Sequence, residues 1–259
     1  MRRALTIGAS DASAASGIQA DLRVFARCGV YGTCAVALVA AQDTFTVRRV
    51  FRLASSIVGA QIDAAVADIG ADAVKIGWYR SPELTTVIAG RLRRRTLKPV
   101  VLDPCLWSER GEALTPPRTV KRMVRELLPH VAVLTVTPRE LGVFAGMPAD
   151  EGPESVAAAI ERVLALGVAN VVVEDPRGAH AVSIGDASGI HAVAEWASPS
   201  PPAGEGALFS AALTAGLAVG QGLREAVRSA VAFMAAMPHT GEILPLGKGL
   251  PVWVPNILS

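Results

Sequence analysis

The stretch with the clearest chemical potential is Gly204-Glu205-Gly206-Ala207, where glycines open directly onto a run of small apolar residues with helical character. The first N–H groups of such a helix have no partner within it, and the helix dipole adds partial positive charge there. This arrangement is a generic seat for an anion. Glu205, however, places a negative charge where an anion would approach, and Ala207 places a methyl group where an acid–base group could stand. The stretch predicts a phosphotransferase architecture with impaired phosphate chemistry.

Four other polar side chains stand at the predicted ends of helices and strands. Gln42 follows a buried run, at the edge where parallel sheets bind ligands. Asp21 lies in the first turn of a predicted helix, where it serves either charge matching or ligand binding. Asp103 ends a strand directly before a proline, either as a functional carboxylate or as a turn residue. Glu140 begins a helix, either as a capping residue or to position a metal or a phosphate-bound water.

The basic residues are spread along the chain, apart from Arg91-Leu92-Arg93-Arg94-Arg95. This cluster is either a nucleic-acid patch or a solvated helix end, and we favour the helix end because cations suit a helix C-terminus. Lys75 lies inside an apolar run, so it must find a carboxylate or carbonyl partner, since an unpaired buried ammonium is costly. We expect this pairing to be structural. With a net charge of +2, we expect no nucleic-acid partner.

Length and composition predict one large domain, residues 1–259, because 259 residues with 51% hydrophobic content can bury a substantial core and no linker divides them. Three cysteines without metal-ligand spacing fit a reducing cytosol rather than a disulfide framework. The N-terminus lacks the apolar core of a signal peptide, and no run reaches the roughly 18 apolar residues of a membrane span. We therefore expect a soluble, cytoplasmic protein without a membrane partner.

Strand and helix signals alternate along most of the chain. The patterns predict strands at 4–7, 34–41, 73–77, 99–104, 131–137 and 170–173, a hairpin at 181–193, helices at 18–26, 55–68, 82–95, 117–128, 154–166, 208–219 and 223–237, and a loop from 238 onward. Alternation of this kind is typical of an α/β fold with a mostly parallel sheet.

The order of elements and several motifs resemble the ribokinase-like small-molecule kinases, specifically the hydroxymethylpyrimidine (phosphate) kinases of thiamin biosynthesis. The resemblance covers nearly the whole chain and is most specific over residues 4–44. Its motifs are Ala4-Leu5-Thr6-Ile7-Gly8-Ala9-Ser10-Asp11, Gly17-Ile18-Gln19-Ala20-Asp21-Leu22, Ala40-Ala41-Gln42-Asp43-Thr44, Lys75-Ile76-Gly77, Leu102-Asp103-Pro104, the glycines of 204–206 and Gly247-Lys248-Gly249. The resemblance implies a three-layer α/β/α sandwich, a homodimer and a pyrimidine-like small-molecule ligand.

The resemblance also implies roles for individual residues. Gly8, Asp21 and Gln42 would contact the pyrimidine, and Trp78 stands where a methionine is usual and would reshape that pocket. A nucleotide would lie across the later strands. The residues that bind it would be Glu174, Gly204, Glu205 and Gly206. The catalytic position would be Ala207, with Gly204 and Gly206 beside it. The acids on the magnesium side would be Asp103 and Glu140.

The departures from the family pattern fall mainly on the nucleotide side. The family has Gly-Thr-Gly followed by Cys or Asp, and that fourth residue is the general base. Here the fourth residue is Ala207. The general-base contribution to the rate, about 10²- to 10⁴-fold, is therefore absent unless another group substitutes. The usual Lys-Gly-Gly after the late strand is Glu174-Asp175-Pro176. Two acids beside a triphosphate are repulsive.

Three hypotheses follow. The first is a divergent homologue with impaired or lost ATP-dependent phosphoryl transfer and a retained pyrimidine-like pocket. The second is a working kinase that uses Asp103, Asp21 or a water as its base. The third is a structural or regulatory dimer partner of a true kinase. The expected cofactor is Mg-ATP if the chain is active, and none if it is not.

Overall fold

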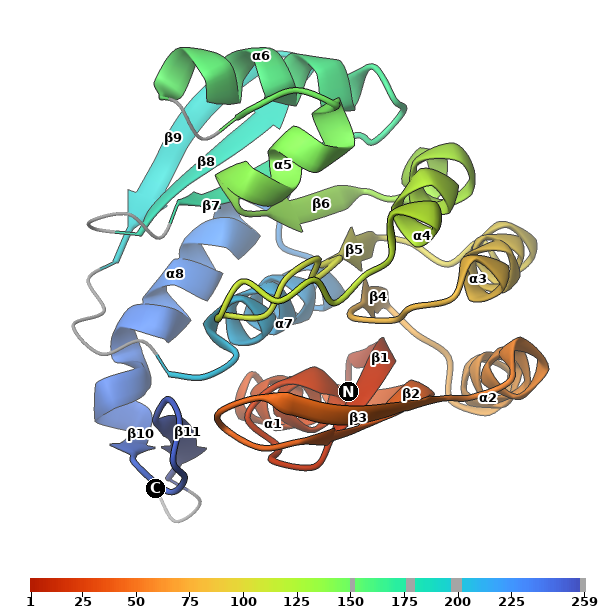
Figure 1. Ribbon diagram of the computed structural model, residues 1–259, viewed down its shortest axis with the longest axis vertical. Coiled ribbons are helices and arrows are strands. Elements are labelled where there is room, and N and C mark those ends of the chain that lie inside the picture. Colours follow the sequence, from red (N-terminus) through yellow and green to blue (C-terminus); the bar gives the residue numbers. More distant parts are fainter. Residues whose placement is uncertain (150–151, 176–179, 197–201, 257–259) are drawn as a thin grey trace.

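A nine-stranded sheet organises the computed structural model, which describes residues 1–149, 152–175, 180–196 and 202–256 (Figure 1). Six neighbouring strands, β2, β1, β4, β5, β6 and β7, run parallel to one another. The other three, β3, β8 and β9, are antiparallel to their neighbours. In spatial order the strands are β3 (Val47–Arg52), β2 (Tyr31–Gln42), β1 (Arg3–Asp11), β4 (Ala73–Ile76), β5 (Val100–Leu102), β6 (Val133–Val136), β7 (Val171–Asp175), β8 (Ala181–Asp186) and β9 (Gly189–Glu195).

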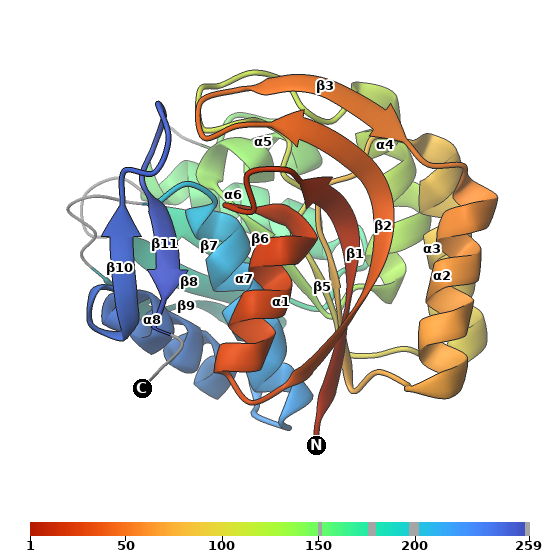
Figure 2. The same cartoon turned by 90° about the horizontal axis from the view of Figure 1, so that it is seen from below.

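Helices cover both faces of the sheet (Figures 1 and 2). One face carries α1 (Gly17–Arg27), α7 (Glu205–Ala218) and α8 (Leu223–Thr240). The other carries α2 (Ser55–Asp68), α3 (Pro82–Arg95), α4 (Pro117–Arg122) with its continuation through Met123–Leu127 and Leu128–His130, α5 (Pro138–Ala145) and α6 (Pro153–Leu164). A separate apolar core fills each interface. The predicted three-layer α/β/α sandwich with a mostly parallel sheet is confirmed.

Local sequence signals explain most element boundaries. Every residue of β4, β5 and β6 is buried, because both faces of a parallel sheet are covered by helices. Ser81 caps α3 by accepting a hydrogen bond from the N–H of Leu84, and a proline occupies the first turn. The hairpin predicted around 185–189 is formed by β8 and β9. These signals act within a few residues, so they can be recognised in the sequence.

Two regions differ from the sequence-based prediction. The edge strand β3 was not expected; four of its six residues are arginines or exposed apolar side chains, and charge of this kind blunts an edge strand. The chain beyond 237 was predicted as a loop, which is wrong. Helix α8 continues to Thr240, and β10 (Gly241–Leu244) pairs with β11 (Val252–Pro255). Burial of Trp253, whose Nε1 donates to the Met237 carbonyl, stabilises this hairpin.

A buried ion pair joins the two helices and two strands at the centre of the molecule. Lys75 of β4 is 1% exposed, and its Nζ lies 2.5 Å from Asp21 Oδ1 of α1 and 2.9 Å from the Ala207 carbonyl of α7. The second oxygen of Asp21 accepts a hydrogen bond from Thr6 Oγ1 of β1 at 2.6 Å. The prediction that Lys75 has a structural carboxylate or carbonyl partner is confirmed, and it has both.

Replacement of Lys75 by methionine is expected to lower the free energy of unfolding by about 3–5 kcal/mol, because it leaves the Asp21 carboxylate buried without a cation. Urea unfolding followed by circular dichroism measures the loss. The matched variant, Lys75→Met with Asp21→Leu, removes both charges and is expected to recover part of it. A single variant as stable as the wild type would contradict a stabilising role for the pair.

Candidate functional site

The polar side chains predicted from the sequence gather at the carboxyl ends of the parallel strands, beside the start of α7. Asp103 follows β5 directly, and its Oδ2 accepts a hydrogen bond from Ser210 Oγ of α7 at 2.7 Å. The same oxygen lies 3.8 Å from Lys75 Nζ. Ala207 is linked to this group through its carbonyl. The structure thus brings Asp21, Asp103 and Ala207 together around one lysine.

Asp21 lies beneath this group and has no access to solvent. Its side chain is 2% exposed, and both carboxylate oxygens are hydrogen-bonded. Burial raises the pKa of Asp21, and the charge and hydrogen bond of Lys75 oppose that rise. The sequence placed Asp21 in the first turn of its helix, which is wrong, because α1 begins at Gly17 and its first turn holds no acidic residue. A direct substrate contact by Asp21 stays a prediction; the geometry gives it the task of holding Lys75.

A carboxylate already stands at the start of α7. Glu109, in the connection that follows β5, accepts a hydrogen bond through Oε1 from the N–H of Gly204, the N-cap of α7, at 2.6 Å. Gly204 has a φ of +77°, and a side chain there would collide with the carbonyl of Ala15. Desolvation raises the pKa of Glu109, the Gly204 N–H opposes the rise, and the nearby Glu205 adds to it. Glu109 was not among the predicted site residues.

The Glu205 side chain is held toward the β8–β9 side of the sheet. Its Oε1 accepts a hydrogen bond from Trp196 Nε1 at 3.3 Å, and its Oε2 lies 3.6 Å from His180 Nδ1. The rings of His180, Trp196 and Phe209 stack in sequence, with centroid separations of 4.9 and 5.7 Å. The sequence singled out none of these three rings, because nothing in their spacing indicates that they meet.

Glu174 brings a further acid to the same region from the end of β7. Burial raises its pKa well above the ordinary value, and the charges of Asp103, Glu140 and Glu205 add to the rise, whereas Lys75 opposes it. No hydrogen bond joins the Glu174 side chain to another of the described residues. The predicted repulsive position is therefore occupied by a half-buried acid that the charges of Asp103, Glu140 and Glu205 affect. Pro176, which was singled out with it, lies outside the described residues.

Glu140 has the capping role that the sequence left open. Its Oε2 lies 3.1 Å from both the N–H and the hydroxyl of Thr137, and Thr137 accepts in return from the Glu140 N–H, so the two form a capping box. Its Oε1 accepts from the Leu106 N–H at 2.8 Å. Among the described residues, no three metal-ligating side chains cluster. Because Mg²⁺ is often bound by one or two carboxylates together with phosphates, a metal role for Asp103 and Glu140 stays a prediction.

The ends of β1 and β2 form a separate polar network around Asp11. Its carboxylate accepts hydrogen bonds from the N–H groups of Ser13 and Ser16, at 2.8 and 3.0 Å, and from both hydroxyls. Gln42 Nε2 lies 3.4 Å from Asp11 Oδ2 and from Ser16 Oγ. The network fixes the loop of small residues that follows β1. Gln42 reaches it by long contacts only, which a ligand can replace at little cost.

Trp78 lies beside this network and has an unsatisfied donor. Gly8 packs over Gly77, directly before Trp78. The Trp78 side chain is 8% exposed in an apolar cluster with Leu38, Ala40 and Leu114, among others, and its Nε1 has no hydrogen-bond partner among the described residues. Buried N–H groups are rarely left without an acceptor. This orphan donor fits a ligand that supplies one.

The connection between β10 and β11 covers the end of β2. Thr44 accepts two hydrogen bonds from it, one from the Gly249 N–H to Oγ1 at 3.1 Å and one from the Leu250 N–H to the carbonyl at 3.2 Å. A side chain at position 249 would overlap Thr44, so glycine is required there. The Gly247-Lys248-Gly249 motif therefore closes over the predicted pyrimidine side of the site.

The fold and this arrangement of polar groups at the strand ends define a ribokinase-like small-molecule kinase. The chain resembles the Bacillus subtilis pyridoxal kinase solved as an ADP complex, with a TM-score of 0.87, 28% identity and coverage of 98% of this chain and 97% of that one. It also resembles the Clostridium difficile phosphomethylpyrimidine kinase, with a TM-score of 0.81, 29% identity and coverage of 90% and 98%.

Residues 11–250 match the family model for phosphomethylpyrimidine kinase, and the chain belongs to that family. It is 34% identical to the hydroxymethylpyrimidine/phosphomethylpyrimidine kinase of Rhizobium meliloti over 95% of this chain and 94% of the relative. The corresponding Salmonella typhimurium kinase is 29% identical over 95% and 94%. The predicted family is confirmed. In the part of the chain that the structure describes, no helix has the length and apolarity needed to span a bilayer.

Replacement of Glu174 by glutamine is expected to stabilise the protein increasingly as pH rises. The raised pKa means that native Glu174 holds its proton where the unfolded chain has lost it, so wild-type stability falls as pH increases above the ordinary value of 4.5. The variant has no such proton to lose. Urea unfolding over a pH series should show a difference that is smallest below pH 4.5 and grows above it. Glu161→Gln, at an exposed position on α6, serves as the control, and equal behaviour of the two variants would contradict the assignment.

Proposed function

We propose that this protein binds an aminopyrimidine-like small molecule at the ends of β1 and β2 and transfers phosphate from Mg-ATP far more slowly than its kinase relatives. The observation that carries the proposal is the carboxylate of Glu109 on the Gly204 N–H, at the start of α7. That helix end is where a transferring phosphate would be stabilised. An internal carboxylate there competes with the phosphate for the same donor.

The charges around this helix end do not fit a triphosphate. Lys75, the cation at its centre, is buried and already bonded to Asp21 and to the Ala207 carbonyl. Glu109 places a carboxylate where the phosphates would lie, and Glu174, whose raised pKa favours the protonated acid, supplies no cation there. Phosphoryl transfer depends chiefly on positioning and on electrostatic stabilisation of the transferring group. The residues at hand oppose that stabilisation, and Ala207 supplies no base.

The other half of the site suits a neutral or cationic nitrogen heterocycle. Gln42 can donate and accept hydrogen bonds at once, and Trp78 has an indole N–H that needs an acceptor. A ring nitrogen of a pyrimidine is such an acceptor. The relatives carry the names of hydroxymethylpyrimidine, phosphomethylpyrimidine and pyridoxal kinases, so the ligands in their names are substituted heterocycles of this kind.

In an assay with Mg-ATP and hydroxymethylpyrimidine, ADP formation by this protein is expected to be at least about 100-fold slower than by the Rhizobium meliloti relative measured alongside, since the base alone contributes about 10²- to 10⁴-fold. The Ala207→Cys variant is expected to stay slow, because the acids that oppose the triphosphate remain. Turnover near the rate of the relative would overturn the proposal and support a working kinase with another base, such as Asp103.

Replacement of Glu109 by glutamine is expected to tighten the binding of Mg-ADP roughly fivefold, because it removes one partly screened charge worth about 1 kcal/mol while it keeps the size of the side chain. Isothermal titration calorimetry measures the change. Glu112→Gln removes an exposed charge from the same connection and should leave the affinity within about twofold. An unchanged affinity in Glu109→Gln would show that Glu109 does not obstruct the nucleotide.

Replacement of Trp78 by phenylalanine is expected to weaken the binding of hydroxymethylpyrimidine by roughly five- to tenfold, because a neutral hydrogen bond contributes about 1 kcal/mol and the ring is retained. Calorimetry gives the affinity, and a thermal scan confirms that folding is preserved. Trp107→Phe is the control, since Trp107 packs under Arg139 outside this cluster. Equal affinities for wild type and Trp78→Phe would show that the indole N–H does not bind the ligand.

A further inference from the structure

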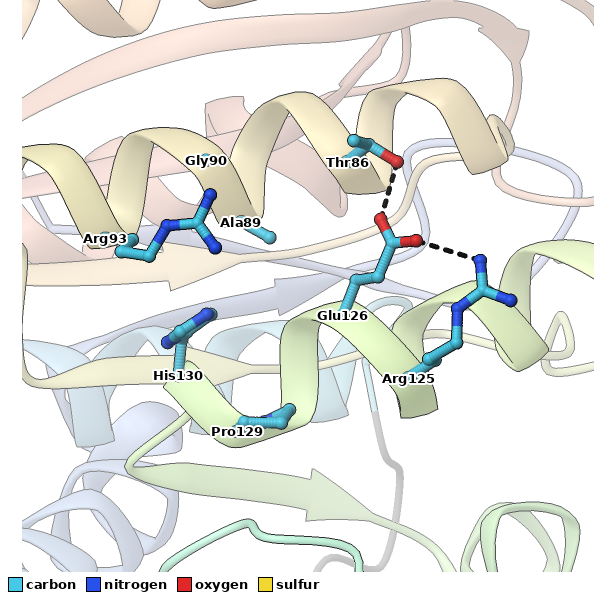
Figure 3. Close-up of a pocket in the computed structure, with 8 residues that line it drawn as sticks. All are labelled: Thr86, Ala89, Gly90, Arg93, Arg125, Glu126, Pro129 and His130. Atoms are coloured by element: carbon cyan, nitrogen blue, oxygen red, sulfur yellow. Dashed lines mark hydrogen bonds and ion pairs between the residues drawn. The ribbon is translucent and has the colours of Figure 1, made fainter.

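A small hollow of about 240 Å³ lies between α3 and the helical turns that follow α4 (Figure 3). None of its lining residues belongs to the site at the strand ends. Arg93 and Gly90 line it from α3, and Arg125, Glu126 and His130 line it from the opposite wall. Figure 3 shows the Arg93 guanidinium and the His130 ring extending from opposite walls toward the space between the two helices. A guanidinium and an imidazole therefore face the hollow from two separate elements.

The single acid in the lining is already neutralised. Glu126 accepts hydrogen bonds from Thr86 Oγ1 at 2.6 Å, from Arg125 at 2.9 Å and from Arg122 at 3.2 Å. These contacts hold the pKa of Glu126 below its usual range, with the Thr86 bond as the largest cause. The carboxylate is thus saturated by its own neighbours. It leaves the charge of Arg93 on the far wall uncompensated.

The arginine run of α3 divides into two roles. Arg91 and Arg95 turn toward Asp63 of α2, with contacts of 3.2 and 3.5 Å. Arg93 makes no ion pair or hydrogen bond with any other residue in the described ranges. The arginine run is therefore more than a solvated helix end, because Arg93 lines the hollow while Arg91 and Arg95 pair with Asp63.

Gly90 lines the hollow, and the packing around it does not require glycine. It lies inside α3, where glycine costs stability relative to alanine. A Cβ at this position would find only the Arg94 guanidinium nearby, at 3.8 Å, which is ordinary contact. The fold would accept a side chain there. Glycine at this position instead leaves the helix backbone open to an anion that enters between Arg93 and His130.

We propose that this hollow binds a small phosphate-bearing anion. Guanidinium groups match phosphate oxygens with paired hydrogen bonds, and here Arg93 would bind the anion from one wall and His130 would donate from the other, while Arg125 stays paired with Glu126. A volume of about 240 Å³ suits a phosphate or pyrophosphate group. The inference is independent of the function proposed for the strand-end site.

Calorimetry on the full chain with inorganic phosphate, pyrophosphate and glycerol 3-phosphate, at near-physiological salt, tests the proposal. We expect saturable binding of at least one of them, weakened at least tenfold in Arg93→Ala and to a smaller degree in His130→Ala. Arg27→Ala, an exposed arginine at the end of α1 on the other face, removes the same charge and should change the affinity by less than twofold. Tighter binding of the inorganic ions identifies a free phosphate site, and tighter binding of the ester identifies a phosphorylated metabolite.

Gly90→Ala separates binding from folding. The added methyl group is expected to raise the midpoint of thermal unfolding, because alanine favours the helix, and at the same time to weaken pyrophosphate binding by narrowing the hollow. The proposal is overturned if none of the three anions binds, if Arg93→Ala binds as tightly as the wild type, or if Arg27→Ala loses as much affinity as Arg93→Ala. Binding of an RNA oligonucleotide alone, without any of the three anions, would overturn it as well.

Discussion

The buried ammonium of Lys75 is the constraint on which the centre of this structure depends. A charge that is 1% exposed must be matched, and the matching groups come from α1, as Asp21, and from α7, as the Ala207 carbonyl. This contact fixes the start of α7 against β4 and so fixes the helix end that any anion would approach. It also consumes the positive charge at the middle of the strand ends. The electrostatics of the site are then set by its acids.

Those acids are costly to keep together, which makes their presence informative. Burial and mutual repulsion raise the pKa values of Glu174, Glu140 and Glu109. Glu140 recovers part of the cost as a helix cap, and Glu109 recovers part through the Gly204 N–H. Glu174 has no comparable hydrogen bond among the described residues. An arrangement of this kind favours neutral or cationic ligands and disfavours polyphosphates, because Lys75, the cation at its centre, is already bonded to Asp21 and to the Ala207 carbonyl.

The sequence predicted the elements whose signals are local and missed those that depend on distant contacts. Helices α2 and α3 both have the predicted ends; α3 begins at its Ser81 cap and proline, whereas the bounds of α2 follow from the spacing of its apolar residues alone. Strands β10 and β11 were missed because they exist through pairing and through the burial of Trp253, neither of which leaves a periodic pattern. The need of Lys75 for a partner was predictable from its apolar neighbours, although the partner was not. Glu109 was hidden because it stands in an ordinary polar turn, 95 residues from Gly204.

The two halves of the site are built on different principles, yet they share one connecting segment. The Asp11 network is made chiefly of contacts within the loop after β1, and Ala15 and Ser16 of that loop pack closely against Gly204 at the start of α7. The connection that carries Glu109 is nonetheless anchored to the pyrimidine side, because the Arg110 guanidinium lies 3.4 Å over the ring of Phe45, in the turn after β2. Displacement of Glu109 from Gly204 must therefore move a segment that is tied to the end of β2. The obstruction of the anion seat and the shape of the pyrimidine side are held by the same stretch of chain.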